Sequence, residues 1–500
     1  MSPVFQRWLI LAIVSVALFL IVVDVTVLYL ALPALTHDLQ ASASQKLWIV
    51  NAYALAVAAL LPSTGTLGDR LGHKQLFVYG MMVFGVASLL AAFSPSATVL
   101  ISSRVLLGLG AAMMMPSTLA IIRIVFEDPQ QRALAIGIWA SIASGGAAVG
   151  PIVGGFLLEY FWWGSVFLVN VPIILIALPI AYRFIPTIAR NPNRAFDGVA
   201  AIAVMIALVT FTLGIKTLGN FAQEWPLGIL LLVISVLAAW GLHARQRHTG
   251  QPLLDFALFH HPVFRAGCAT AVTATAVLLG MELAITQRFQ LVYEMSAWEA
   301  GLSLLPIPVS AFLVGPISGH YLHRIGVHRT LWLSLLIAGV GFTLYALTLH
   351  ATLVVQFVGF VFIGIGIGAA MTAASNAMLL NAPLELSGMA ASIEEVSYEM
   401  GAALGVAVLG SLLMVIYNLS FDVPASLSLS AEQSAQIAHH IDSAVDALKH
   451  LTGTQAQALR QQINLAFDQA VLWVTWLSAV ALFLISAWIY RLRTKSQKLR

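Results

Sequence analysis

Long apolar segments recur fourteen times along this 500-residue chain, and they constrain its fold more than any other feature. Segments of about 19 to 28 apolar residues are long enough to cross roughly 30 Å of hydrocarbon as α-helices. The sequence therefore predicts an all-α integral membrane protein of fourteen transmembrane helices. We expect them near residues 8–32, 46–65, 76–94, 98–121, 133–158, 165–185, 198–216, 226–244, 265–290, 299–321, 331–349, 352–374, 388–416 and 470–490.

The composition excludes a water-soluble globular protein. Hydrophobic residues make up 60% of the chain and charged residues only 9%, whereas soluble domains have about 25% charged residues. The single cysteine, Cys268, excludes an internal disulfide framework. We find no nucleophile elbow, zinc motif or phosphate-binding loop, so we expect neither an enzyme, nor a metal site, nor ATP as the energy source.

Basic residues indicate the orientation in the membrane. Most of the 24 Lys and Arg fall at the two ends of the chain and in alternate loops. Because positively charged loops stay in the cytoplasm, we expect both termini to be cytoplasmic. The net charge of +3 then reflects topology, and it gives no reason to expect a nucleic-acid partner.

Glycine and arginine landmarks recur half a chain apart. The pairs are displaced by 254 to 256 residues and comprise Gly65 and Gly319, Arg70 and Arg324, Gly72 and Gly326, Gly108 and Gly364, Gly146 and Gly401, and Gly150 and Gly405. Such duplication is typical of transporters built from two parallel repeats. We expect a six-helix half at 1–190, two inserted helices at 191–250 and a second six-helix half at 251–500.

Five acidic residues lie inside the predicted spans: Asp24, Glu282, Glu394, Glu395 and Glu399. Carboxylates at membrane depth cost about 2.5 to 3.5 kcal/mol each, so a chain that carries several is predicted to use them for protons, ions or cationic solutes. Glu395 and Glu399 are four residues apart and share a helix face, whereas Glu394 is rotated by about 100°. Glu394 could instead lie near the cytoplasmic boundary.

Two further pairings are predicted from depth along the helices. Asp24 and Arg104 should both lie roughly 9 to 12 Å below the outer boundary at a rise of 1.5 Å per residue, which permits an ion pair. That pair is either a permanent structural bridge or one that protonation of Asp24 breaks during transport. Glu282 is predicted to face Asp24 across a central cavity, with local pairing to Arg288 as the alternative.

The longest loop is expected at residues 418–468 on the extracytoplasmic side. Its apolar residues are spaced as in two short amphipathic helices around Thr452 and Gly453, which predicts a helical hairpin. An inert linker is the alternative.

Several motifs carry a family resemblance. They run from Asp24 to Pro33, from Gly65 to Gly72 with Asp69 and Arg70 inside, from Arg104 to Gly110, and from Gly146 through Gly150, Pro151 and Gly154 to Gly155. In order, they resemble the first-helix, cytoplasmic-loop, fourth-helix and antiporter signatures of the major facilitator superfamily, in its fourteen-helix drug:proton antiporter branch. The segment from Glu394 to Gly401 resembles the acidic segment of quaternary-ammonium exporters.

Two departures from the family pattern limit the comparison. This chain has Trp162, Trp163 and Gly164 where the branch often has Trp-Arg-Trp, so any role of that arginine is absent. The second copy of the loop signature has His323 in place of an aspartate. Only Asp69 of the first copy is therefore expected to make acidic contacts at the cytoplasmic gate.

The resemblance implies a function. It indicates a monomeric multidrug efflux antiporter of the cell inner membrane, driven by the proton gradient without a cofactor. The implied cargo is lipophilic organic cations such as quaternary ammonium compounds, biguanides, dyes and methyl viologen. Protons and cations would exchange on shared carboxylates. The alternative is a transporter of the same fold that moves a physiological solute and carries drugs incidentally.

Overall fold

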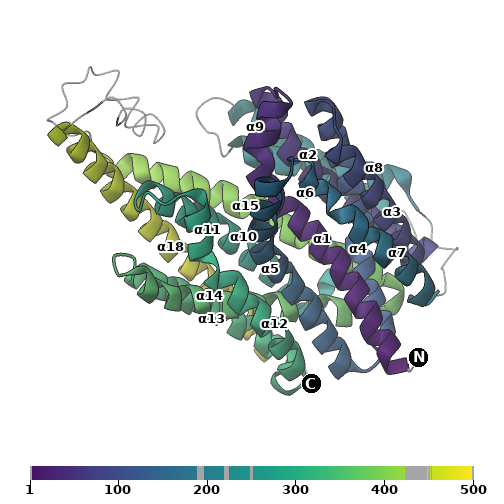
Figure 1. Cartoon of the computed structure of the whole chain (residues 1–500). Coiled ribbons are helices and arrows are strands. Elements are labelled where there is room, and N and C mark those ends of the chain that lie inside the picture. The colour runs from purple at the N-terminus through teal and green to yellow at the C-terminus, as the bar shows by residue number, and fades with distance from the viewer. Residues whose placement is uncertain are drawn as a thin grey trace.

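The computed structural model describes residues 3–187, 196–218, 225–247, 252–422, 448, 451 and 453–497. Fourteen helices in these ranges, two of them interrupted by a break, are long and apolar enough to cross a membrane, as predicted. The two ends of the chain lie at the same end of the bundle (Figure 1), which an even number of crossings requires. Below, this is called the termini end.

The first six-helix half has one interrupted span. Its helices are α1 (Pro3–Asp38), α2 (Ala43–Leu71), α3 (His73–Ala92), α4 (Ala97–Val125), α5 (Pro129–Tyr160), and the broken span α6 (Ser165–Leu168) with α7 (Asn170–Phe184). The inserted helices are α8 (Gly198–Leu218) and α9 (Trp225–Gln246). The expected boundaries at 190/191 and 250/251 lie outside the described residues.

The second half begins after a short 3-10 helix, η1 (Phe256–His260). It comprises α10 (Pro262–Leu291), the broken span α11 (Ala297–Leu304) with α12 (Pro306–Ile325), α13 (Val327–Leu347), α14 (Leu353–Leu380), the 3-10 turn η2 (Leu384–Leu386), α15 (Ser387–Ser420) and α18 (Gly453–Gln497).

Helix caps reproduce the sequence repeat. Ser42 begins α2 with a capping box to Gln45, and Ser296 begins α11 with the same arrangement to Glu299. Each capping box gives a hydrogen-bond acceptor to two backbone N–H groups that a helix start otherwise leaves unpaired. The matching spans end at Gly72 and Gly326, with φ of 102° and 88°. Only glycine adopts such angles without strain, so both copies need it at this turn.

Helix contacts follow the same symmetry. In the first half α1 packs on α5, and α4 packs on α2 and α3; in the second half α10 packs on α15, and α14 packs on α12 and α13. Two seams join the halves, α2 against α15 and α5 against α12. The inserted α8 contacts both helices of the first seam, α2 and α15. The inserted pair therefore lies beside a seam, where it contacts both halves.

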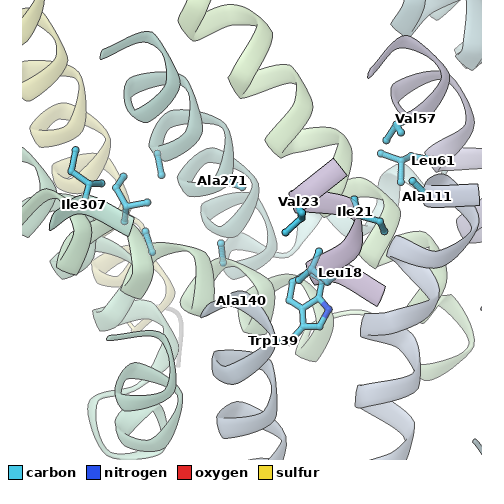
Figure 2. Packing of buried hydrophobic residues seen from close by; sticks show 14 of the residues in the cluster. Leu18, Ile21, Val23, Val57, Leu61, Ala111, Trp139, Ala140, Ala271 and Ile307 are labelled. Atoms are coloured by element: carbon cyan, nitrogen blue, oxygen red, sulfur yellow. The ribbon is translucent and has the colours of Figure 1, made fainter. Parts of the chain in front are cut away.

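The hydrophobic core extends through both halves. Figure 2 shows Leu18 and Trp139 of the first half together with Ala271 and Ile307 of the second. Burial of apolar side chains here comes from contact between helices, because each helix is apolar around its whole circumference. Small residues then decide which helix faces approach most closely.

Glycines allow the closest helix contacts at equivalent places in the two halves. A Cβ atom on Gly150 would lie 1.9 Å from Oγ1 of Thr26, between α5 and α1. A Cβ atom on Gly405 would lie 1.9 Å from the carbonyl oxygen of Ala276, between α15 and α10. Gly401 and Gly405 therefore let α15 approach α10 closely.

Replacing Gly405 with alanine should force α15 away from α10. Overpacking of a tight contact costs about 1 to 3 kcal/mol, and the atom met here is backbone, which cannot rotate aside. Gly410→Ala on the same helix is the matched control, because its Cβ would meet Leu283 at an ordinary 3.5 Å. Thermal unfolding in detergent measures the difference. Equal melting temperatures for the two variants would contradict the proposed contact.

The expected loop at 418–468 is shorter than predicted. Helix α15 continues to Ser420, and α18 runs without interruption from Gly453 to Gln497. The second amphipathic segment is therefore the first part of the last span and not a separate helix, because Leu459, Ile463 and Phe467 are buried against the bundle. The first half of the expected hairpin lies outside the described residues.

Candidate functional site

Asp24 and Arg104 form the predicted ion pair. Nη1 of Arg104 donates to Oδ2 of Asp24, and the two residues are 1% and 2% exposed. Nε of Arg104 also donates to the carbonyl of Ile49 at 3.3 Å, and its guanidinium carbon lies 4.5 Å from the ring centre of Tyr53. A guanidinium over an aromatic face gains a cation-π attraction, so this pair has several partners of its own.

The pair is enclosed by the first half. Asn170 of α7 lies 3.5 Å from Oδ1 of Asp24 and 3.2 Å from Oγ of Ser88 through the same amide nitrogen. The prediction that Asp24 faces Glu282 across a cavity is therefore wrong. Asp24 and Arg104 lie at a common level, as predicted, but α1 is rotated so that the carboxylate points into its own half.

Glu394 is buried between α14 and α15. Oγ of Ser375 donates to its Oε1, and Tyr398 lies beside the carboxylate. Glu394 is 0% exposed, so its carboxylate is enclosed by protein and not by solvent. No described group donates to Oε2 of Glu394. A buried carboxylate that lacks a full set of donors is costly in its charged form.

Glu395 and Glu399 share a face of α15, and together with the adjacent Glu394 they are called the acidic face below. Glu395 is 4% exposed, no described group donates to its Oε1, and it lies within electrostatic range of Glu394 and Glu399. Glu399 is half-buried. Three neighbouring carboxylates cannot all stay charged at low cost, because like charges repel strongly where water is excluded. The charged form of this group of carboxylates is therefore costly unless positive charge lies close to it.

Glu282 on α10 faces the other half of the molecule. Its side chain is exposed although protein surrounds it, and it lies within electrostatic range of Tyr29 on α1, whose side chain is 59% exposed. Tyr29 is also within range of Glu399. The two side chains come from opposite halves, and both are exposed in the bundle. Tyr29, and not Asp24, is the first-half residue opposite Glu282.

Arg288 does not pair with Glu282, so that alternative is wrong. It is 1% exposed and donates from Nε to Oδ1 of Asp468 on α18 at 2.6 Å, and from Nη2 to the carbonyl of Leu349 at 2.9 Å. The second half thus contains an Arg–Asp pair of its own, in which the arginine is buried and the aspartate half-buried. Sequence reasoning missed Asp468, because it was assigned to the end of a loop.

Contacts between the halves gather at the termini end. Asp69 accepts hydrogen bonds from the backbone nitrogens of Gly388 (2.8 Å) and Met389 (3.2 Å) at the start of α15. Unpaired amides and the helix dipole favour a carboxylate there. Arg123 on α4 donates to the carbonyls of Ala382 and Pro383, just after α14. Among these residues, sequence reasoning found only Asp69.

The motif glycines have different neighbours. Gly65 and Gly388 touch across the seam, since a Cβ atom on either would lie 2.4 Å from the carbonyl oxygen of the other. Arg70 is half-buried, and His323 is exposed and hydrogen-bonds within its own helix, to the carbonyl of His320. Gly146 and Gly154 of the predicted antiporter motif pack against α1 like Gly150. In the same segment, Pro151 is half-buried and Gly155 faces Trp298 of the second half at 4.0 Å.

Replacing Gly65 with alanine should weaken closure at the termini end. The new methyl group would collide with backbone of α15, so the seam must separate by a few tenths of an ångström or more. We expect faster labelling of a cysteine placed at Ser392, which lines the contact. Gly241→Ala is the control, because nothing lies within 4 Å of its Cβ position. Equal labelling rates in both variants would contradict this role of Gly65.

The described residues contain no group of three or more His, Cys, Asp or Glu arranged to hold a metal ion. The acidic side chains of α15 share a helix face or one turn, and that arrangement leaves no convergent ligand set.

Residues 14–406 match the family model of the Major Facilitator Superfamily. The chain is 37% identical over 466 residues to the methyl viologen resistance protein SmvA of Salmonella typhimurium, covering 93% of each chain. It is 36% identical over 468 residues to the multidrug efflux pump LfrA of Mycolicibacterium smegmatis, covering 93% of this chain and 92% of that one. The tetracenomycin C resistance and export protein of Streptomyces glaucescens is 33% identical over 415 residues, covering 82% and 76%.

Solved structures agree on the fold. The human organic anion transporter MFSD10 superposes with a TM-score of 0.64 at 14% identity, covering 96% of this chain and all of that one. The proton:xylose symporter XylE superposes with a TM-score of 0.62 at 12% identity, covering 98% and 96%. These identities show the fold alone. Taken with the repeats, the fourteen spans and the family match, they lead to one conclusion: the chain is a multi-pass membrane transporter that belongs to the Major Facilitator Superfamily.

Proposed function

We propose that this protein is a proton-coupled efflux antiporter that exports lipophilic organic cations across the cytoplasmic membrane. The observation that carries the proposal is the acidic face of α15. Glu394, Glu395 and Glu399 lie within the span, and Tyr29 of the other half is within electrostatic range of both Glu399 and Glu282. The described residues supply too little positive charge to neutralise all four carboxylates, so we infer that mobile positive charges neutralise the remainder.

Exchange follows from exclusive occupancy. A carboxylate surrounded by apolar groups is neutralised either by a proton or by a bound cation, and the two cannot occupy one carboxylate together. One pH unit supplies about 1.4 kcal/mol per proton, and a potential of about 100 mV supplies 2.3 kcal/mol per net charge moved. Exchange of one proton for one monovalent cation is electroneutral. Export of a dication needs at least two protons, and several acids are available.

The orientation proposed for the chain places both termini in the cytoplasm, because most basic residues lie in the loops of that side. The contacts of Asp69 and Arg123 would then close the cytoplasmic side. Glu282 and Tyr29 remain accessible, which fits an outward-facing state in which protons enter and cargo leaves. We place the acids inside the membrane because they lie within α10 and α15, and transporters built from two repeats bind substrate near the midplane.

The cargo class is supported by two lines. The named relatives include a methyl viologen resistance protein and a multidrug efflux pump, and methyl viologen is itself an organic cation. In addition, Tyr29 lies beside Glu282 and Glu399. An aromatic face next to carboxylates attracts flat or quaternary cations by about 0.5 to 2 kcal/mol. Quaternary ammonium compounds, dyes and biguanides share these features. We propose that the transporter works as a monomer.

Proton release on cargo addition tests the proposal. Purified protein in weakly buffered detergent solution should release protons when methyl viologen or a quaternary ammonium compound is added. A neutral compound of similar size should release none. Proteoliposomes with an imposed pH gradient should then move the cation against its own gradient. Cation transport without proton release would contradict coupling, and transport of a neutral solute alone would favour the physiological-solute alternative.

A further inference from the structure

Lys216 on the inserted helix α8 contacts the first six-helix half. It lies two residues before the end of α8, and its Nζ donates to Oδ1 of Asn51 on α2 at 2.7 Å. A lysine near the end of a membrane helix normally extends to the polar boundary. Here the ammonium is held by a residue within the neighbouring span. Packing of α8 on α2 provides this direction.

The helix that carries this ammonium also contacts α15, the helix of the acidic side chains. The charge of Lys216 acts on Glu399 of that helix. Lys216 is exposed, whereas the other basic group near this region, Arg104, is buried and bound to Asp24. Lys216 is therefore positioned to give Glu399 a counter-charge that belongs to the protein.

Other charged and titratable groups face Glu399 from the neighbouring helices. Glu395 lies within electrostatic range on the same helix, and Tyr29 approaches from α1. Glu282 on α10 is also within electrostatic range of Tyr29. Apart from Lys216, these groups are acidic or neutral, so they attract a cation and do not compete with one.

We propose that Lys216 is a tethered ammonium that competes with the exported cation for Glu399 and so favours release of the cargo on the outer side. This inference rests on the proposed export of organic cations. A tethered group acts at a high effective concentration, in the millimolar range for short flexible links. An organic cation at Glu399 must therefore displace Lys216. This competition gives the inserted helices α8 and α9 a role in transport.

Removal of this charge should tighten binding. Full-length Lys216→Gln protein in nanodiscs keeps a hydrogen-bonding side chain but loses the ammonium. We expect it to bind tetraphenylphosphonium about tenfold more tightly than the unmodified protein, which corresponds to about 1.4 kcal/mol. Lys216→Met should show the same gain, and Lys216→Arg should behave like the unmodified protein. Isothermal titration calorimetry measures all four.

Lys46→Gln is the matched control. Lys46 is an exposed lysine in the first turn of α2, so its removal changes the net charge equally without changing the counter-charge of Glu399. We expect no change in affinity. Unchanged or weaker binding by Lys216→Gln and Lys216→Met, while the unmodified protein binds, would overturn this inference alone. Absence of cation binding by every variant would overturn it together with the proposed function.

Discussion

Replacing Asp24 with asparagine should destabilise the protein by about 3 to 5 kcal/mol, because removal of one partner from a buried ion pair leaves the other charge uncompensated. Arg104 is 1% exposed and would lose its carboxylate partner. The carbonyl of Ile49 and the ring of Tyr53 would remain, but neither carries a full negative charge. We therefore expect this single neutral substitution to lower the melting temperature strongly.

Thermal unfolding in detergent measures this effect, and Glu294→Gln provides the control. Glu294 pairs with Arg460 at 2.5 Å, but their side chains are 59% and 55% exposed. Exposed pairs contribute little to stability. The double variant Asp24→Asn with Arg104→Gln should recover much of the loss, since no unpaired charge is left. If the Asp24→Asn variant has the same melting temperature as the control, the ion pair is dispensable for the fold. That result would favour a transport role for Asp24.

Replacing Glu395 with glutamine should abolish proton-driven export and leave the fold intact. A neutral amide takes up neither a proton nor an organic cation at this position. Loss of coupling removes a driving force worth a factor of about ten in gradient for each pH unit. We expect the initial rate of export under a one-unit gradient to fall at least tenfold. Stability should hold or improve, because Oε1 of Glu395 has no described donor and its charge is costly to bury.

The opposite stability effects of the two substitutions separate function from folding. Proteoliposomes with an imposed pH gradient report export, and thermal unfolding reports the fold. Glu127→Gln is the control, because Glu127 is exposed between α4 and α5. Export at the unmodified rate by Glu395→Gln would show that this carboxylate has no part in coupling. Glu399 and Glu282 would then remain as the acids of these spans that are not fully buried.

The sequence alone predicted features that depend on local pattern. Apolar length gave the fourteen spans, and glycine spacing gave the repeat that recurs in the caps at Ser42 and Ser296. Position along a helix gave the common depth of Asp24 and Arg104, because the rise per residue is constant. The four-residue spacing of Glu395 and Glu399 placed them on one face for the same reason.

Contacts between distant helices were decided only by tertiary structure. The rotation of α1 turned Asp24 toward Arg104 and away from Glu282, and the packing of α18 brought Asp468 to Arg288. These helices are apolar on all sides, so no apolar stripe in the sequence indicates which face of a helix points to the interior. Spacing within one helix sets depth and relative direction. Which neighbour a side chain meets depends on how closely small residues let the helices approach, and one sequence does not contain that information in any local form.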